Sequence, residues 1–158
     1  PQTFEAEKLG LKTIAHSGDC NARQPILLVA NMDYANKHKG DIVAFLRVYL
    51  RSVDMMKKTP AEDLADDYMR FYNAWTGKAM TREEAIRDIK DHPVYALDQQ
   101  LAMFKQSYGT SELREWLHDI VSFQNETGEL DRRDLARLER LHYVTDIYLK
   151  AVKEPAKK

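Results

Sequence analysis

Cysteine is almost absent from this chain. Cys20 is the only cysteine among 158 residues, which excludes an internal disulfide and a zinc site made of several thiolates. The histidines do not replace the missing ligands, because none has a His or Cys partner at the spacing of helical metal ligands. They are His16, His38, His92, His118 and His142. We therefore expect no metal site, and we interpret Cys20 as a small packed residue and not as a nucleophile.

Long apolar runs and an excess of one charge are also absent. The longest runs, such as Ile26–Ala30, are far shorter than the ~20 residues that a membrane-spanning helix needs. Lysine and arginine (24 together) balance aspartate and glutamate (25), so no general positive field attracts phosphate backbones. With 44% hydrophobic and 31% charged residues, the composition is typical of a soluble globular protein of about one domain. We expect the chain neither to insert into a membrane nor to bind nucleic acid.

The common catalytic motifs are missing as well. The sequence has no glycine-rich phosphate loop and no nucleophile elbow. The acidic residues between Glu62 and Asp67 lie near a predicted helix start, where the helix dipole stabilises negative charge. The aromatic row Tyr68–Trp75 has the spacing of core packing, with a stacking platform as the alternative. We therefore predict that the chain is not an enzyme and uses no cofactor.

Most of the chain has the pattern of amphipathic helices. Apolar residues recur at three- and four-residue intervals over Ile42–Met56, which places them on one face of a predicted helix. Thr59–Glu62 and Thr81–Glu84 have the pattern of capping boxes and predict the starts of two more helices, the first of which ends at Gly77. Further helices are predicted at Asp98–Tyr108, Ser111–Asn125 and Asp131–Val152.

Only the N-terminal part shows a different pattern. Phe4–Leu9 is typical of a helix end that Gly10 closes, and Leu11–Ala15 and Ile26–Ala30 are short apolar runs suited to buried strands. We therefore predict a mostly α-helical chain with two or three short strands near its N-terminus. The expected parts are a helix end plus strand, loop and strand at 1–31, a helical region at 32–152, and a flexible basic tail at 153–158.

The polar segment His16–Gln24 is the best candidate binding element. Its Gly, Asp and Asn residues are turn chemistry, and loops that join strands often carry function. Ser17 and Asn21 supply hydrogen bonds, and Arg23 can hold a carboxylate or sulfonate through two parallel hydrogen bonds. The alternative is an ordinary turn in which Arg23 pairs with Asp19. The candidate ligand-binding residues are His16, Ser17, Asp19, Asn21 and Arg23.

The order of these segments resembles a known pattern. A predicted strand is followed by a short spacer with the pair Tyr34-Ala35 and by a long amphipathic helix that includes Phe45–Asp54. Tyr68-Met69-Arg70-Phe71-Tyr72, Gln99–Phe104 and Trp116-Leu117 continue the pattern. Together, over nearly the whole chain, these packing and capping patterns resemble the solute-binding proteins of ABC importers in the nitrate, sulfonate and taurine group.

This resemblance implies a bilobal α/β protein with the type 2 periplasmic binding protein fold. Such proteins are roughly twice as long, so this chain looks like a C-terminal half that supplies part of the cleft. The resemblance places His16–Gln24 near the interlobe crossing and implies a small anionic solute as the ligand. It also implies the membrane permease of an importer as the partner and a periplasmic or extracytoplasmic location, although this chain has no signal peptide.

Two other functions are open. A related branch with this fold makes the thiamine pyrimidine and consumes an internal histidine, but it has a cysteine-rich run, and one cysteine argues against it. A helical protein-interaction or regulatory module explains the amphipathic helices equally well and needs no upstream half.

Overall fold

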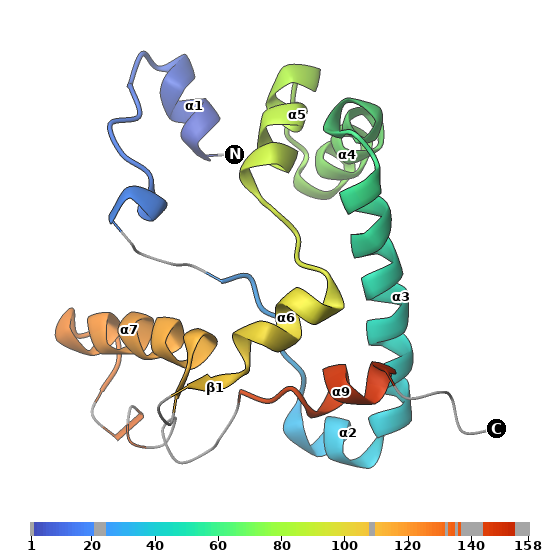
Figure 1. Cartoon of the computed structure of the whole chain (residues 1–158). Coiled ribbons are helices and arrows are strands. Elements are labelled where there is room, and N and C mark those ends of the chain that lie inside the picture. The colour runs from blue at the N-terminus through green and yellow to red at the C-terminus, as the bar shows by residue number, and fades with distance from the viewer. Residues whose placement is uncertain are drawn as a thin grey trace. The chain divides into compact units, whose positions relative to one another are not determined.

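The computed structural model describes residues 2–20, 25–107, 110–131, 133, 134, 136 and 144–153. The chain divides into two compact units. The first unit contains Pro1–Ala15 and Tyr49–Ala96, and the second contains His16–Val48 and Leu97–Lys158. Both are built mainly of helices, which confirms the predicted helical character (Figure 1).

The first unit is a small helical cluster. It consists of α1 (Gln2–Lys8), the second half of α3 (Lys39–Lys58), α4 (Ala61–Thr76) and α5 (Arg82–Asp91). Its core combines Phe4 of α1 and Met80 with two fully buried alanines, Ala65 and Ala85. Because alanine side chains are small, they let α4 and α5 pack closely against each other.

The predicted helix boundaries of this unit are correct in two cases and wrong in one. Gly77 ends α4 in a left-handed conformation with φ 69°, and Thr81 and Glu84 form both hydrogen bonds of the capping box that starts α5. Thr59, however, does not cap α4. Its hydroxyl donates to the Met55 carbonyl at 2.8 Å, and no side chain caps the start of α4. Pro60 occupies the N-cap position of α4 instead, and its side chain has no hydrogen-bonding group.

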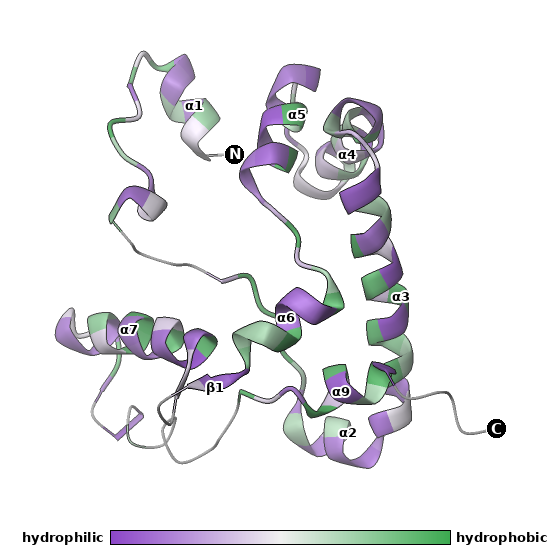
Figure 2. Cartoon of the chain, viewed as in Figure 1, coloured by the Kyte–Doolittle hydropathy of each residue, from purple (hydrophilic) through white to green (hydrophobic). Residues whose placement is uncertain are grey.

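Helix α3 shows the predicted amphipathic face. Leu46, Leu50 and Val53 are buried, as their spacing predicts, whereas Phe45 is 55% exposed. Figure 2 shows apolar and polar residues alternating along the helix. In the described part of the chain, no helix is both long and apolar enough to cross a membrane.

In its described residues, the second unit combines helices with a small strand pair. Its elements are η1 (Ser17–Cys20), α2 (Met32–Lys37), the first half of α3, α6 (Leu97–Met103), β1 (Gln106–Ser107), β2 (Thr110–Ser111), α7 (Glu112–Glu126) and α9 (Ile147–Lys153). The strands β1 and β2 pair antiparallel, with Gln106 opposite Ser111. Helix α6 therefore ends earlier than predicted, because Gln106 and Ser107 pair with β2 and do not extend the helix. Helix α6 contacts α9, and β2 contacts α7.

The predicted N-terminal strands are wrong. Neither Leu11–Ala15 nor Ile26–Ala30 forms a strand, and the only strand pair in the described residues is β1 with β2. Ile14 is 98% exposed and Val29 is 91% exposed, so these apolar runs are not buried. A strand needs a neighbouring strand for its backbone hydrogen bonds, and an apolar run alone does not supply one.

The long C-terminal helix is also interrupted. Residues 144–146 are not helical, and α9 starts only at Ile147, where Thr145 Oγ1 accepts from the Ile147 N–H at 3.3 Å. Lys153, predicted to begin a flexible tail, is the last residue of α9. The other apolar residues of the predicted face at 135, 138 and 141, and the rest of the tail, lie outside the described residues.

Candidate functional site

The predicted binding segment is described only in its first part. His16, Ser17 and Asp19 lie in or next to the short 3-10 helix η1, and all three are exposed. Asp19 uses its carboxylate locally, because Oδ2 accepts the His16 N–H at 2.8 Å while its own N–H donates to the His16 carbonyl at 2.9 Å. This reciprocal pair closes the turn. The other two candidate residues, Asn21 and Arg23, lie outside the described residues.

Cys20 does not have the predicted packed position. It is exposed at the end of η1. The one-turn helix η1 has no buried residues, so Cys20 has no core of its own element to pack into. Cysteine is often buried, but the residue type alone does not predict burial at this position.

A second group of polar residues, in the second unit, surrounds an open pocket of about 800 Å³. We call it the basic pocket. It is lined by Leu101, Ala102, Phe104, Lys105, Gln106, Ser111, Arg114, Val144, Thr145, Asp146, Lys150 and Lys153. These residues come from α6 and the two residues after it, from the strand pair and α7, and from α9 and the three residues before it.

The basic pocket is named for its charge. Its lining includes four cationic side chains and a single carboxylate, that of Asp146. Lys150 Nζ lies 2.7 Å from Asp146 Oδ2, so one ammonium is held by that carboxylate. Counted over the lining alone, four cations and one carboxylate give an excess of positive charge. Such a site attracts anions, and guanidinium and ammonium groups are the side chains that bind them.

The backbone around the basic pocket is well anchored. Ser111 is 4% exposed, and its hydroxyl accepts the Arg114 N–H at 3.4 Å, which starts α7 at the pocket. Leu149 is 8% exposed and holds α9 in its unit. Three of the lining cations, Arg114, Lys150 and Lys153, thus stand on elements that are fixed by a cap or by a buried neighbour.

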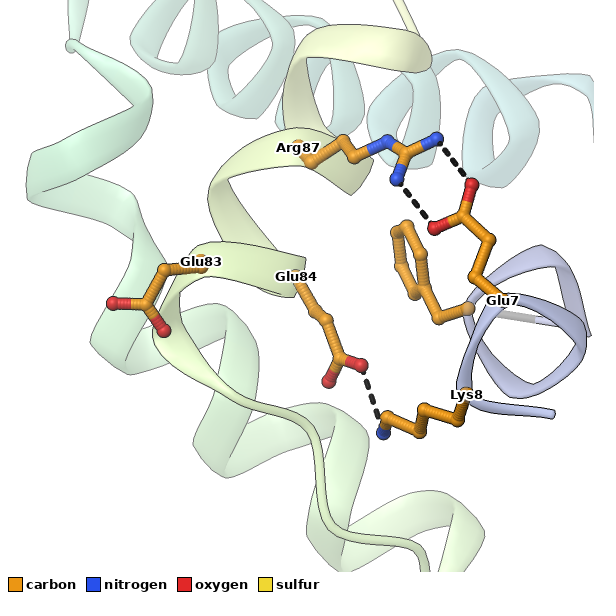
Figure 3. A pocket seen from close by; sticks show the side chains of 6 residues that line it. Glu7, Lys8, Glu83, Glu84 and Arg87 are labelled. Atoms are coloured by element: carbon orange, nitrogen blue, oxygen red, sulfur yellow. Dashed lines mark hydrogen bonds and ion pairs between the residues drawn. The ribbon is translucent and has the colours of Figure 1, made fainter. Parts of the chain in front are cut away.

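A pocket of about 310 Å³ in the first unit has a different charge arrangement. It is lined by Phe4, Glu7, Lys8, Glu83, Glu84 and Arg87, and we call it the paired pocket. Arg87 donates to both carboxylate oxygens of Glu7, at 2.7 and 3.0 Å, and Lys8 lies 2.8 Å from Glu84. Figure 3 shows these two pairs, with Glu83 pointing away from both. Each cation of this pocket already has a carboxylate partner.

The ionisation of the first unit reflects this pairing. The hydrogen bond from Lys8 holds the pKa of the Glu84 carboxyl below its usual range, and the hydrogen bond to Glu7 raises the pKa of Arg87. The guanidinium carbon of Arg87 also lies 5.2 Å from the centre of the Phe4 ring. These contacts join α1 to α5, so the charges of the paired pocket have a structural use.

A third polar cluster lies at the end of α5. The carboxylate of Asp88 is buried and accepts a hydrogen bond from the Tyr68 hydroxyl, while the His92 ring Nδ1 lies 2.8 Å from the Asp88 carbonyl oxygen. Burial, followed by the bond to Asp88, raises the pKa of the Tyr68 phenol. The cluster fastens α4 to α5 and ends α5 at His92.

Comparison with protein-family models, with curated proteins and with solved structures gives no significant match. The resemblance to solute-binding proteins therefore stays a prediction from the residues.

The basic pocket was not predicted from the sequence. Its cations come from three separate parts of the chain, with Lys105 between α6 and β1, Arg114 in α7, and Lys150 and Lys153 in α9. No short motif joins them, because the fold brings them together. One sequence signal was present: no acidic residue occurs between Asp98 and Glu112, whereas that stretch contains Lys105.

Proposed function

We propose that this chain binds a small anionic solute in the basic pocket. The observation that carries the proposal is the lining of four cations and one carboxylate around about 800 Å³ of open space. Surplus cationic side chains around one concavity raise the local concentration of anions. A pocket of this size is within the usual range for small-molecule ligands.

The wider role that we propose is that of a solute-binding component of an ABC importer. It rests on the resemblance of the spacer with Tyr34-Ala35 and the long helix to that group, whereas the strand that the pattern places before them does not form at Ile26–Ala30. In this role the chain forms part of a bilobal protein of the type 2 periplasmic binding protein fold, outside the cytoplasm, and delivers its solute to a membrane permease. Solute binding favours the closed arrangement of two lobes because it contacts both, and no bond of the solute changes.

The basic pocket and the predicted segment His16–Gln24 are two possible positions for the solute. The described residues of the segment are exposed, and His16, Ser17 and Asp19 are not among the residues that line either pocket. The basic pocket offers more converging cations than this segment, in which Arg23 is the one Lys or Arg. We therefore assign solute binding to the basic pocket.

Calorimetric titration with sodium sulfate at constant ionic strength tests the proposal. We expect saturable but weak binding, with a Kd of about 1 mM, because few contacts surround so open a site. The double variant Lys105→Gln with Lys153→Gln should bind sulfate at least about fivefold more weakly. A matched control is Lys57→Gln with Lys58→Gln at the end of α3, outside the pocket lining. Sulfate binding that is absent, or equal in both double variants, would contradict the proposal.

A helical protein-interaction module is the second candidate, and one observation favours it. Phe71 and Trp75 of α4 are 65% and 80% exposed, and their rings stack at 6.0 Å between centres. An exposed aromatic pair is typical of binding surfaces. A defined protein partner that is recovered with the natural chain and lost with Trp75→Ala would support this function.

A further inference from the structure

Asp146, the carboxylate in the lining of the basic pocket, forms an ion pair with Lys150 of the same lining. Asp146 lies directly before α9, and its side chain is 20% exposed. Its Oδ2 lies 2.7 Å from Lys150 Nζ, one helical turn along the chain, and the Lys150 N–H donates to the Asp146 carbonyl at 2.9 Å. Asp146 thus binds Lys150 through both its side chain and its backbone.

The side-chain pair is not needed to start the helix. At the start of α9, Thr145 Oγ1 accepts the Ile147 N–H, whereas the Asp146 carboxylate reaches the ammonium of Lys150. The backbone bond from Lys150 to Asp146 is independent of the carboxylate. Both charged groups line the basic pocket, so their pair lies where an anionic ligand would bind.

We infer that Asp146 limits the anion affinity of the basic pocket, because its carboxylate pairs with Lys150 and a bound anion must displace it from that ammonium. The inference rests on the proposed anion binding. A carboxylate and a solute anion compete for the same ammonium donors, so the solute must replace an existing ion pair and not merely add one. Asp146 therefore weakens the binding of every anion that uses Lys150, and so sets the anion affinity of the pocket.

The inference predicts a gain of affinity from the loss of a pocket residue. Asp146→Asn keeps the size of the side chain and removes its charge, so sulfate should bind about two- to fivefold more tightly than to the natural chain. The control Asp119→Asn makes the same change of net charge on α7 at an 83% exposed position outside the pocket lining. It should leave sulfate binding unchanged.

A double-mutant cycle separates competition at Lys150 from a general effect of charge. In the natural chain, Lys150→Gln should weaken sulfate binding little, because Asp146 already holds that ammonium. In the Asp146→Asn background the same substitution should weaken binding several-fold, since Lys150 then faces the ligand alone. Equal effects in both backgrounds would overturn the inference, because a general field effect is additive.

The outcomes also distinguish this inference from the proposed function. If the natural chain binds sulfate and Asp146→Asn binds it equally or more weakly, the inference about Asp146 is wrong, while the proposal that the basic pocket binds anions is retained. If neither protein binds sulfate, both the function and the inference fail. Circular dichroism of each variant checks that α9 and the rest of the helices are retained, and Asp146→Ser repeats the measurement with a smaller side chain if Asp146→Asn does not fold.

Discussion

The two pockets of this molecule differ in what their charges do. In the paired pocket of the first unit, Arg87 and Lys8 each bind a carboxylate of the same unit. The lining of the basic pocket in the second unit has four cations and one carboxylate, and that carboxylate pairs with Lys150. Charges that pair across two helices hold those helices together, whereas an excess of charge of one sign attracts ions of the opposite sign. The difference indicates that the charges of the paired pocket stabilise the fold, whereas those of the basic pocket are the ones that we propose to bind an anion.

The largest expected effect comes from breaking the core beside the paired pocket. Phe4→Ala removes a buried ring that α1 contributes to the core and that lies under Arg87. We expect the free energy of unfolding to fall by about 2–4 kcal/mol, because truncation of a buried aromatic ring leaves a cavity. Urea denaturation measures the loss.

Phe71→Ala is the matched control for that change. Phe71 is 65% exposed, so its loss should change the free energy of unfolding by at most about 0.5 kcal/mol. An equal loss for Phe4→Ala and Phe71→Ala would contradict the position of the core.

A reversal of charge in the basic pocket should give the next largest effect. Lys105→Glu adds a second carboxylate to the lining and should weaken sulfate binding about tenfold. Lys58→Glu at the end of α3 makes the same charge change outside both pocket linings and should bind sulfate normally. Calorimetry distinguishes the two, and similar losses in both would mean that only net charge matters.

The pairing in the first unit predicts a pH dependence of stability. The pKa values of Glu5, Glu62 and Glu84 are lowered, chiefly by hydrogen bonds from Lys78, Lys90 and Lys8. A lowered pKa means that the stabilisation is complete above the ordinary glutamate value of about 4.3 and is lost as pH falls through the lowered pKa. The Tm should therefore drop as the pH falls from about 5 to about 3.

Glu84→Gln tests this pH dependence at one pair. The amide keeps an acceptor for the Thr81 N–H but has no charge for Lys8, so the Tm of the variant should change less with pH than that of the natural chain. Glu83→Gln is the neighbouring control, because Glu83 points away from both pairs (Figure 3). It should keep the pH dependence of the natural chain.

The smallest expected effect is at the segment first singled out from the sequence. Ser17 is exposed in η1 and does not line either pocket. Ser17→Ala should change the sulfate affinity less than about 1.5-fold, within the usual range for a surface substitution. A clear loss of binding would move the site from the basic pocket back to His16–Gln24.

Local patterns predicted the helices well. The capping box of Thr81 and Glu84, the stop at Gly77 and the buried face with Leu50 and Val53 depend on neighbours within one or two turns, and all were predicted. The N-terminal strands were not, because an apolar run forms a strand only where another strand supplies hydrogen bonds. The prediction for Thr59 was wrong by one position, because α4 takes Pro60 as its N-cap while the Thr59 hydroxyl bonds to the end of α3.

The basic pocket was harder to predict than the helices, because residues from distant parts of the chain form it. Lys105 and Lys150 line one pocket although they lie 45 positions apart, and neither has a motif around it. The aromatic row shows the same limit within one helix: Tyr68 packs on the core, whereas Trp75 is 80% exposed. Spacing identifies a helix, but the packing of other elements decides which of its residues are covered.

The most direct test of the central claim is a nitrogen–proton correlation spectrum recorded during titration with sodium sulfate at constant ionic strength. If the basic pocket binds sulfate, the backbone amides of Lys105, Arg114 and Lys150 should show saturable shifts, whereas those of Glu7, Glu84 and Arg87 in the paired pocket should stay constant. Saturable shifts in the paired pocket, or uniform small shifts along the whole chain, would contradict anion binding in the basic pocket.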